Sequence, residues 1–384
     1  MITNQRLASG AARMDSAMRE RGLWPDADSP WVRDAMTALP RHAFAPDTLW
    51  SWNGHEWVSA DRATDPERWA DLVYPGPDDS TVIQVTDGLA TSSLSCVAVV
   101  ADMLDSLILE PEHSVLELGT GAGWNAALLA HRAGPGGQVV SMETDPVLAE
   151  AAARRLKAHG CDVEVRCGDG SLGAPERGPY DRVIATYAVD TLPWPWIQAT
   201  RPAGRIVYPW GRMGHFALTV ADDGQSATGW LQGLALFMPD RHTPQASPVP
   251  ATLRASGHGA VTDAELLADL ATGHLLFALR VSHPHILITV EQHNGQPRAE
   301  LRDQTGRTVR AELTTNAQVQ ISDSGKDLWA DLRSGYQLWR EHGRPEQWDF
   351  GMTVTPHAQT VWVRSPDNGP YTSPPHRPGS ESDQ

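Results

Sequence analysis

The sequence predicts an α/β fold: a doubly wound, mostly parallel sheet, preceded by N-terminal helices and followed by a separate C-terminal α+β domain. First, strand-like and helix-like segments alternate between residues 115 and 208, which is typical of parallel strands joined by right-handed crossovers. Second, glycines spaced G-x-G-x-G follow the first of these strands, at residues 119–123. Third, a proline-rich stretch over 239–250 precedes segments with strand-like alternation.

The chain before the alternation has three kinds of segment. Apolar residues at helical spacing predict helices within residues 1–45. Residues 50–74 contain four tryptophans without a clear period, so we expect a long ordered loop or lid there. A short strand is predicted at 81–85, and a helix at 95–107.

The alternating region gives the most regular pattern. Strands are predicted at 115–118, 138–142, 163–166, 180–186 and 205–208, with helices at 124–132, 146–158 and 194–200. In such a sheet a ligand binds at the carboxyl ends of the strands. Beyond the linker, strands at 286–290 and 361–363 indicate an antiparallel sheet, and a helix is predicted at 327–340.

Composition limits the classes of partner. A chain of 384 residues is too long for one ordinary core. Its net charge of −16 argues against nucleic acid and anionic membranes as partners. Because no signal pattern or apolar run of membrane-spanning length is present, we expect a cytoplasmic protein. Cys96, Cys161 and Cys167 form neither a disulfide framework nor a zinc site, and no metal is expected.

The glycine run favours a nucleotide-like ligand. Glycine permits a tight strand-to-helix turn and a close approach of ligand to backbone. A phosphate loop has Lys and Ser or Thr after its last glycine, whereas Trp124 and Asn125 stand here. Together with the acidic Glu117 before the glycines, this favours S-adenosylmethionine over a phosphate. A plain strand–helix turn is the alternative.

Two further carboxylates follow the next strands. Glu143 ends the second strand, where it can accept hydrogen bonds from both ribose hydroxyls; an exposed turn carboxylate is the alternative. Asp169, within Gly168–Gly170, ends the third and can accept from the adenine amine; an Asx turn is the alternative. The predicted cofactor-binding residues are Glu117, Gly119, Thr120, Gly121, Gly123, Trp124, Glu143, Thr144, Gly168, Asp169 and Gly170.

These motifs, in this order, resemble the protein-L-isoaspartate O-methyltransferase family over about residues 41–211. The matching segments are 41–46 (R-x-x-F-x-P), 115–124 (V-L-E-L-G-T-G-A-G-W), 168–170 (G-D-G), 179–181 (P-Y-D) and 201–205 (R-P-A-G-R). The resemblance implies a Rossmann-like methyltransferase sheet. It also implies S-adenosylmethionine as methyl donor, S-adenosylhomocysteine as product and a peptide carboxylate as acceptor.

The family's active-site motif, T-I-S-Q-P, is only partly present. Counting back without gaps from residues 100–103 aligns Ser95 with the family's active-site serine and Ser93 with its threonine, while the Gln and Pro are missing. These two serines are the predicted catalytic residues, and a one-step shift within residues 91–95 is an alternative register. Ser95 also suits a helix N-cap, a role compatible with binding a carboxylate.

The departures from the family shift the predicted function. The segment 50–69 and the residues after the linker are additions, and their Trp and Tyr residues suit an interface with one peptide. The segment 328–362 resembles an extension in methyltransferases associated with ribosomally made, modified peptides such as lanthipeptides and graspetides. This resemblance implies methylation of an ordinary aspartate in a dedicated, cyclised precursor peptide, leading to succinimide and then isoaspartate.

Four regions follow from this interpretation: an N-terminal helical or lid segment (1–78), a methyltransferase domain (79–238), a substrate-binding domain (251–366) and a disordered tail (367–384). Repair of isoaspartate in damaged proteins is the second interpretation. The third is a non-catalytic S-adenosylmethionine-binding peptide adaptor, since two motif residues are absent. The sequence assigns no oligomeric state.

Overall fold

The computed structural model describes residues 2–25, 29–211, 214–235, 237–240, 254–258, 261–303, 305–313, 319–323 and 328–372. The chain divides into two compact units. The first comprises residues 1–241 with 354–358, and the second comprises 242–353 with 359–384. The predicted linker lies almost entirely outside the described residues.

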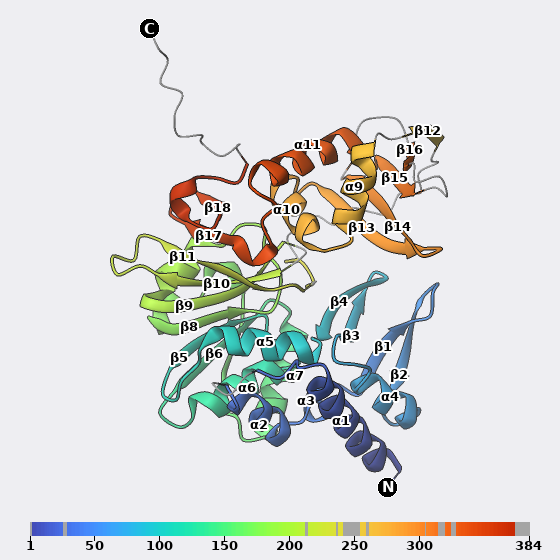
Figure 1. Cartoon of the computed structure of the whole chain (residues 1–384). Helices are drawn as coiled ribbons and strands as arrows, with labels where there is room; N and C mark the ends of the chain where they lie inside the picture. Colours follow the sequence, from blue (N-terminus) through green and yellow to red (C-terminus); the bar gives the residue numbers. More distant parts are fainter. Residues whose placement is uncertain are drawn as a thin grey trace. The chain divides into compact units, whose positions relative to one another are not determined.

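The first unit is built on the predicted sheet (Figure 1). Its strands follow the order β11-β10-β9-β8-β5-β6-β7. They are β5 (Ser114–Leu118), β6 (Gln138–Glu143), β7 (Glu164–Cys167), β8 (Tyr180–Ala185), β9 (Thr200–Trp210), β10 (Gly214–Val220) and β11 (Ala227–Gly233). All neighbours from β9 to β7 pair in parallel, which confirms the predicted doubly wound sheet. The antiparallel additions β10 and β11 were not predicted.

Helices pack on this sheet at the positions that the alternation predicts. They are α5 (Val97–Leu107), α6 (Trp124–Ala133), α7 (Pro146–Ala158) and α8 (Trp194–Ala199). The start of α7 has a clear local cause: Asp145 Oδ1 accepts hydrogen bonds from the backbone N–H groups of Val147 and Leu148, and Pro146 occupies the first turn.

The N-terminal region is helical as predicted, but the expected loop at 50–74 is wrong. The helices are α1 (Ile2–Glu20), α2 (Trp31–Ala38) and α3 (Arg41–Phe44). The supposed loop contains β1 (Thr48–Trp52), β2 (Trp57–Asp61) and α4 (Pro66–Val73). With β3 (Thr81–Thr86) and β4 (Leu89–Leu94), these strands form an antiparallel sheet in the order β2-β1-β3-β4. Tryptophans on the outer face hid the inside–outside alternation of β1.

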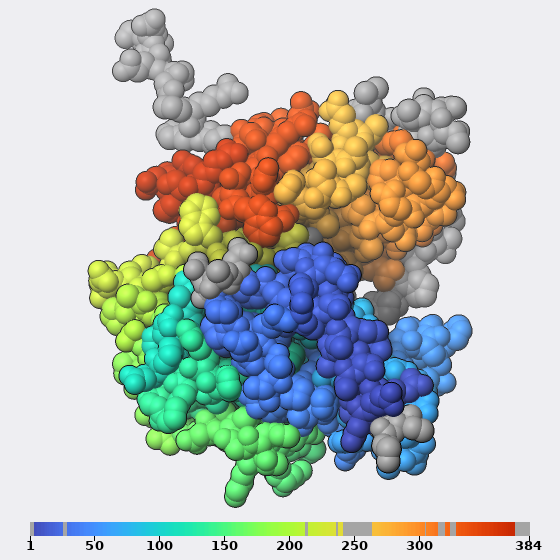
Figure 2. Space-filling model, turned by 60° about the horizontal axis from the view of Figure 1, so that its bottom comes forward, coloured from blue at the N-terminus to red at the C-terminus, as the bar shows by residue number. Residues whose placement is uncertain are grey.

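The N-terminal segment shares its core with the main sheet. One apolar cluster contains Leu7, Met18 and Trp69 together with Val115 of β5 and Leu128 of α6. Figure 2 shows the blue N-terminal segment in one continuous surface with the teal segments of the same unit. No boundary between compact units therefore falls at residues 78 and 79.

The second unit has the mixed composition expected of an α+β domain. Its antiparallel sheet has the order β12-β16-β15-β14-β13, built from β12 (Arg254–His258), β13 (Ile286–His293), β14 (Gln296–Asp303), β15 (Thr308–Leu313) and β16 (Val319–Asp323). Its helices and paired strands are α9 (Val261–Leu270), α10 (His274–Ser282), α11 (Leu328–Glu341), β17 (Phe350–Val354) and β18 (Gln359–Val363).

The prediction of a disordered tail at residues 367–384 is wrong for its first residues. Tyr371 is fully buried, and its backbone N–H donates to the carbonyl of Val361 at 2.9 Å. Asn368 Nδ2 also donates to the carbonyl of Val363 at 2.8 Å, so residues 367–372 are ordered against β18. Residues 373–384 lie outside the described part of the chain.

The shared core predicts that the N-terminal segment unfolds together with the main sheet. Trp69 is fully buried and its Nε1–H donates to the carbonyl of Pro46 at 2.9 Å, so Trp69→Ala should lower the free energy of unfolding by about 3–5 kcal/mol. Trp52→Ala, at a 53% exposed tryptophan, is the control and should change it by less than ~0.5 kcal/mol. Urea denaturation measures both, and equal stability of the two variants would contradict the shared core.

Candidate active site

The glycine loop after β5 takes a backbone path that other residues rarely adopt. Gly119, Gly121 and Gly123 have φ values of 95°, 53° and 89°, in the left-handed region that favours glycine. A Cβ at Gly119 would lie 2.4 Å from Thr186 Oγ1. The loop therefore packs so closely on the end of β8 that only glycine fits there.

Glu143 ends β6 beside this loop and is almost completely buried. Its Oε2 accepts a hydrogen bond from the Gly121 N–H at 2.8 Å, and its Oε1 accepts from the Asp145 N–H at 3.1 Å. The parallel pairing of β5 with β6 brings these strand ends together. The carboxylate thus fixes the loop and remains on the wall of the adjacent cavity.

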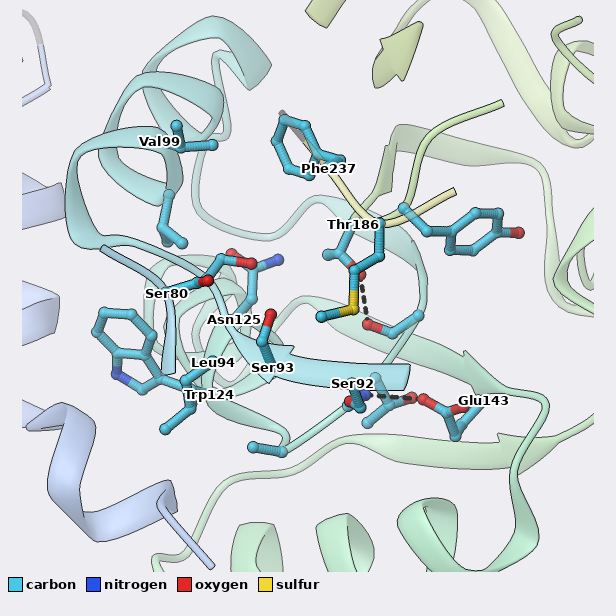
Figure 3. Close-up of a pocket in the computed structure, with 18 of the residues that line it drawn as sticks. Ser80, Ser92, Ser93, Leu94, Val99, Trp124, Asn125, Glu143, Thr186 and Phe237 are labelled. Carbon is cyan, nitrogen blue, oxygen red and sulfur yellow. Dashed lines mark hydrogen bonds between the residues drawn. The ribbon is translucent and has the colours of Figure 1, made fainter. Parts of the chain in front are cut away.

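A cavity of about 240 Å³ opens beside the glycine loop. Its wall comes from the glycine loop, the ends of β6 and β8, the junction of β4 with α5, and residues 237–240. In Figure 3 the Ser93 side chain projects from β4 into the space below Phe237, with Thr186 on one side and Ser80 and Asn125 on the other. The predicted site residues on this wall are Ser93, Ser95, Gly119, Thr120, Gly121, Trp124, Glu143, Thr144 and Gly170.

Glu117, a predicted cofactor-binding residue, lies behind the cavity wall and is fully buried. Its Oε1 accepts from Asn125 Nδ2 at 2.9 Å, and the Ser141 hydroxyl donates to its Oε2. Ser141 also shares a hydrogen bond of 2.6 Å with the hydroxyl of Thr120. Burial raises the pKa of Glu117 to about 7. Its carboxyl group therefore positions two wall residues, Asn125 and Thr120, from beneath.

The structure also leaves Gly123, Gly168 and Asp169 outside the cavity wall. Asp169 is exposed, and its Oδ1 accepts from the backbone N–H of Ser171 at 2.8 Å. This is the Asx turn that the sequence offered as the alternative. Its neighbour Gly170 does line the cavity, and a Cβ there would lie 2.7 Å from the Tyr187 hydroxyl. Binding of adenine by Asp169 stays a prediction.

The two predicted catalytic serines lie where β4 leads into α5, and both line the cavity. The N-cap of α5 is Cys96, and its side chain makes no capping hydrogen bond. The suggested N-cap role of Ser95 is therefore wrong. The helix starts one residue later because the Ser95 carbonyl accepts a hydrogen bond from the guanidinium of Arg41.

Arg41 organises this wall, a role that the sequence did not reveal. Only 2% of the residue is exposed, and its Nη2 donates to Thr81 Oγ1 and to the Leu94 carbonyl, both at 3.0 Å. The guanidinium also lies 5.5 Å from the ring centre of Trp124. Burial lowers the pKa of Arg41 to about 10, so the residue stays charged at neutral pH.

Residues 237–240 are a second part of the wall that the sequence did not predict. The Ala188 N–H donates to the Met238 carbonyl, and the Asp240 N–H donates to the Ala188 carbonyl, both at 2.9 Å. This short bridge has no alternating pattern of its own, and it lies at the edge of the expected linker. The prolines of the expected linker therefore hid the contribution of these residues to the cavity wall.

The wall residues suit S-adenosylmethionine. Gly119, Gly121 and Gly170 lie on the cavity wall and carry no side chain between their backbone and a ligand. Glu143 offers a carboxylate at the strand position used for ribose hydroxyls. Within the described residues, no group of three or more His, Cys, Asp or Glu side chains could hold a metal ion. The described helices are also too short or too polar to cross a bilayer.

The raised pKa of Glu117 predicts a specific pH dependence. Glutamate ordinarily has a pKa of 4.5, and that of folded Glu117 is about 7. The folded state keeps a proton that the unfolded chain releases, so this residue's contribution to stability is lost as pH rises from about 4.5 to 7. Relative to Glu117→Gln, the wild type should lose up to about 3 kcal/mol of unfolding free energy between pH 5 and pH 8.

Chemical denaturation at several pH values measures this difference, and other titrating groups cancel between the two proteins. Glu150→Gln, at an exposed glutamate paired with Arg154, should follow the wild-type profile. Parallel stability profiles of the wild type and Glu117→Gln would contradict a protonated Glu117 in the folded state.

Comparison with known proteins identifies the family of this chain. The family model described as Protein-L-isoaspartate(D-aspartate) O-methyltransferase (PCMT) matches residues 17–232. Protein-L-isoaspartate O-methyltransferase 2 of Archaeoglobus fulgidus is 34% identical over 193 residues, which cover 50% of this chain and 76% of that protein. The Protein-L-isoaspartate O-methyltransferase of Methylorubrum extorquens is 37% identical over 183 residues, covering 48% and 67%.

Solved structures of similar proteins carry the same names. One protein-L-isoaspartate O-methyltransferase aligns over 92% of this chain and 99% of its own, with 18% identity and a TM-score of 0.48. A Plasmodium falciparum protein of this description, in complex with S-adenosyl-L-homocysteine, aligns over 60% and 97%, with 14% identity and a TM-score of 0.45. From the family match and the sequence relatives, the chain belongs to the protein-L-isoaspartate O-methyltransferase family of S-adenosylmethionine-dependent methyltransferases.

Proposed function

We propose that this protein methylates the free carboxylate of isoaspartyl residues in damaged polypeptides, the repair-type activity. The observation that supports it is one cavity wall that holds both the glycine loop with Glu143 and the two serines, Ser93 and Ser95. The family model matches residues 17–232, within the first unit, and the named relatives are isoaspartate methyltransferases. They favour repair over the tailoring of a dedicated peptide, which the sequence had suggested first.

The first unit offers separate positions for donor and acceptor. Glu143 would accept hydrogen bonds from ribose hydroxyls, and the backbone of residues 119–121 would lie against the rest of the donor. S-adenosylmethionine supplies a methyl group on a positively charged sulfur. The β4–α5 junction, on the other part of the same wall, is then left for the acceptor carboxylate.

The residues at the acceptor position have an orienting role. A carboxylate is ionised at neutral pH, so no general base is needed. The hydroxyls of Ser93 and Ser95 can donate hydrogen bonds to it, and the N-terminal end of the eleven-residue α5 favours negative charge. Holding one carboxylate oxygen in line with the methyl group supplies the rate enhancement through orientation.

The product ester then reacts without further help from the protein. The backbone nitrogen of the next residue attacks the ester carbonyl, a new C–N bond closes a five-membered succinimide, and methanol leaves with the proton of that nitrogen. High effective molarity favours this ring closure. Hydrolysis of the succinimide can restore ordinary aspartate, which is the outcome that repair requires.

The tailoring of a dedicated, cyclised precursor peptide is the second candidate. It is favoured by the presence of a separate second unit and by the absence of Gln and Pro from the active-site motif. The aromatic residues of α11, Trp329, Tyr336 and Trp339, are buried and do not themselves offer a surface to a peptide. In that case the second unit would contribute to gripping one peptide, and ordinary aspartate would be the acceptor.

Initial rates with two kinds of substrate separate these functions. With a radiolabelled methyl donor, the intact protein should methylate an isoaspartyl hexapeptide, and the matched aspartyl hexapeptide should stay unlabelled. Faster labelling of a cyclised peptide that carries ordinary aspartate would reject repair in favour of tailoring. Binding of the donor without labelling of any peptide would instead indicate the non-catalytic adaptor.

The serine positions give a second test. Ser95→Ala removes a hydrogen bond to an ionised acceptor, so kcat/KM should fall about ten- to a hundred-fold, while affinity for S-adenosylhomocysteine stays unchanged. Ser226→Ala, on the turn before β11, is the control and should retain full activity. Full activity in Ser95→Ala with a collapse in Ser93→Ala would show that the gapless register is wrong.

A further inference from the structure

The β2-β1-β3-β4 sheet is covered on one face, and its other face is open over β1 and β2, whereas Val82 of β3 on that face is only 7% exposed. On the covered face, Leu49 and Ala60 are buried, and helix α4 packs on both β1 and β2. On the other face Trp52 is 53% exposed, and its ring lies 5.4 Å from that of Trp57 in an edge-to-face arrangement. Aromatic pairs of this kind at a surface are typical of interaction sites.

This open face leads to the active site through the strand register. Trp50 of β1 is paired with Val82 of β3, and Val82 is paired with Ser93 of β4. Residues directly opposite one another in antiparallel strands point to the same face, as do alternate residues of one strand. By this register Trp50 and Trp52 stand on the same face as Ser93, whose side chain enters the cavity (Figure 3).

We propose that this aromatic face, made by Trp50, Trp52 and Trp57, binds the polypeptide that flanks the methyl-accepting residue and selects an aromatic side chain in it. The inference rests on the proposed function, because it takes the acceptor carboxylate to bind at the serines of the cavity. Its occupant is a locally unfolded polypeptide segment in extended conformation.

The strand spacing fixes where the selected side chain stands. Two strand separations of about 4.8 Å each lead from β4 to β1, and Trp52 is about 6.6 Å further along its strand than Trp50. Because the first step runs across the strands and the second along a strand, together they place Trp52 roughly 12 Å from Ser93. An extended peptide advances about 3.3 Å per residue, so the aromatic residue should lie three or four positions from the acceptor.

The chemistry of the face suits an unfolded chain. Large aromatic side chains are mostly buried in folded proteins, so they become available chiefly where a polypeptide has lost its structure. A carboxylate borders the surface: the exposed Glu56 lies in the β1–β2 turn. An acidic residue at the same distance from the acceptor should therefore be disfavoured.

A peptide series tests the inference on the intact protein. Each peptide carries one isoaspartate in a glycine–alanine background, with a single tryptophan placed at each position from five residues before to five residues after it. KM should fall about five-fold when tryptophan stands three or four positions away on one side, with kcat unchanged. Glutamate at that position should raise KM above that of the alanine peptide.

The double variant Trp52→Ala/Trp57→Ala should lose the position dependence and keep its activity on the peptide without tryptophan. Trp230→Ala, which removes a 41% exposed tryptophan of β11, should keep the position dependence. A flat profile in the wild type, or an unchanged peak in the double variant, would overturn the aromatic face and leave the proposed function standing. If none of the isoaspartyl peptides is methylated, the proposed function and the inference are both overturned.

Discussion

The site depends on the hydrogen bonds that the buried guanidinium of Arg41 donates. Desolvating a cation is costly, and hydrogen bonds must offset that cost. Here the hydrogen-bond acceptors are the hydroxyl of Thr81 and the carbonyls of Leu94 and Ser95. A shift of the wall that carries the serines would break these hydrogen bonds and leave the buried charge without them. Among the described residues, no carboxylate forms an ion pair with Arg41.

A second constraint is the close packing at the strand ends. Gly119 has no room for a side chain beside Thr186, and Glu143 holds the loop through the Gly121 N–H. The Arg41 guanidinium lies 5.5 Å from the ring centre of Trp124, which follows the same loop. This contact links the glycine-loop wall, proposed to bind the donor, with the serine wall, proposed to bind the acceptor. For a reaction that depends on alignment, a rigid link between the two walls is more useful than a strong base.

The features that the sequence predicted are those with a local cause. Apolar periodicity located β5, β6 and α7 almost to the residue, and the glycine spacing together with a strand-end acid located the loop and Glu143. The errors have non-local causes. Whether Glu117 faces the cavity or the interior depends on Ser141 of the neighbouring strand, and the start of α5 depends on Arg41, 54 residues earlier in the chain. The sheet containing β1 was missed because tryptophan occupies its outward positions, where polar residues usually reveal a strand.

The departures from the family's active-site motif fit this division of roles. The family's Gln and Pro are replaced by Cys96 and Val97, yet the serines still line the cavity because Arg41 holds the backbone around them. An acceptor that is already ionised asks only for hydrogen-bond donors in fixed places, so residues beside the serines can change without ending the chemistry. Under the proposed function, such changes alter which polypeptide fits next to the acceptor. Selection of the substrate then falls to surfaces outside the motif, and the sheet that delivers Ser93 to the cavity is the one that displays the exposed tryptophans.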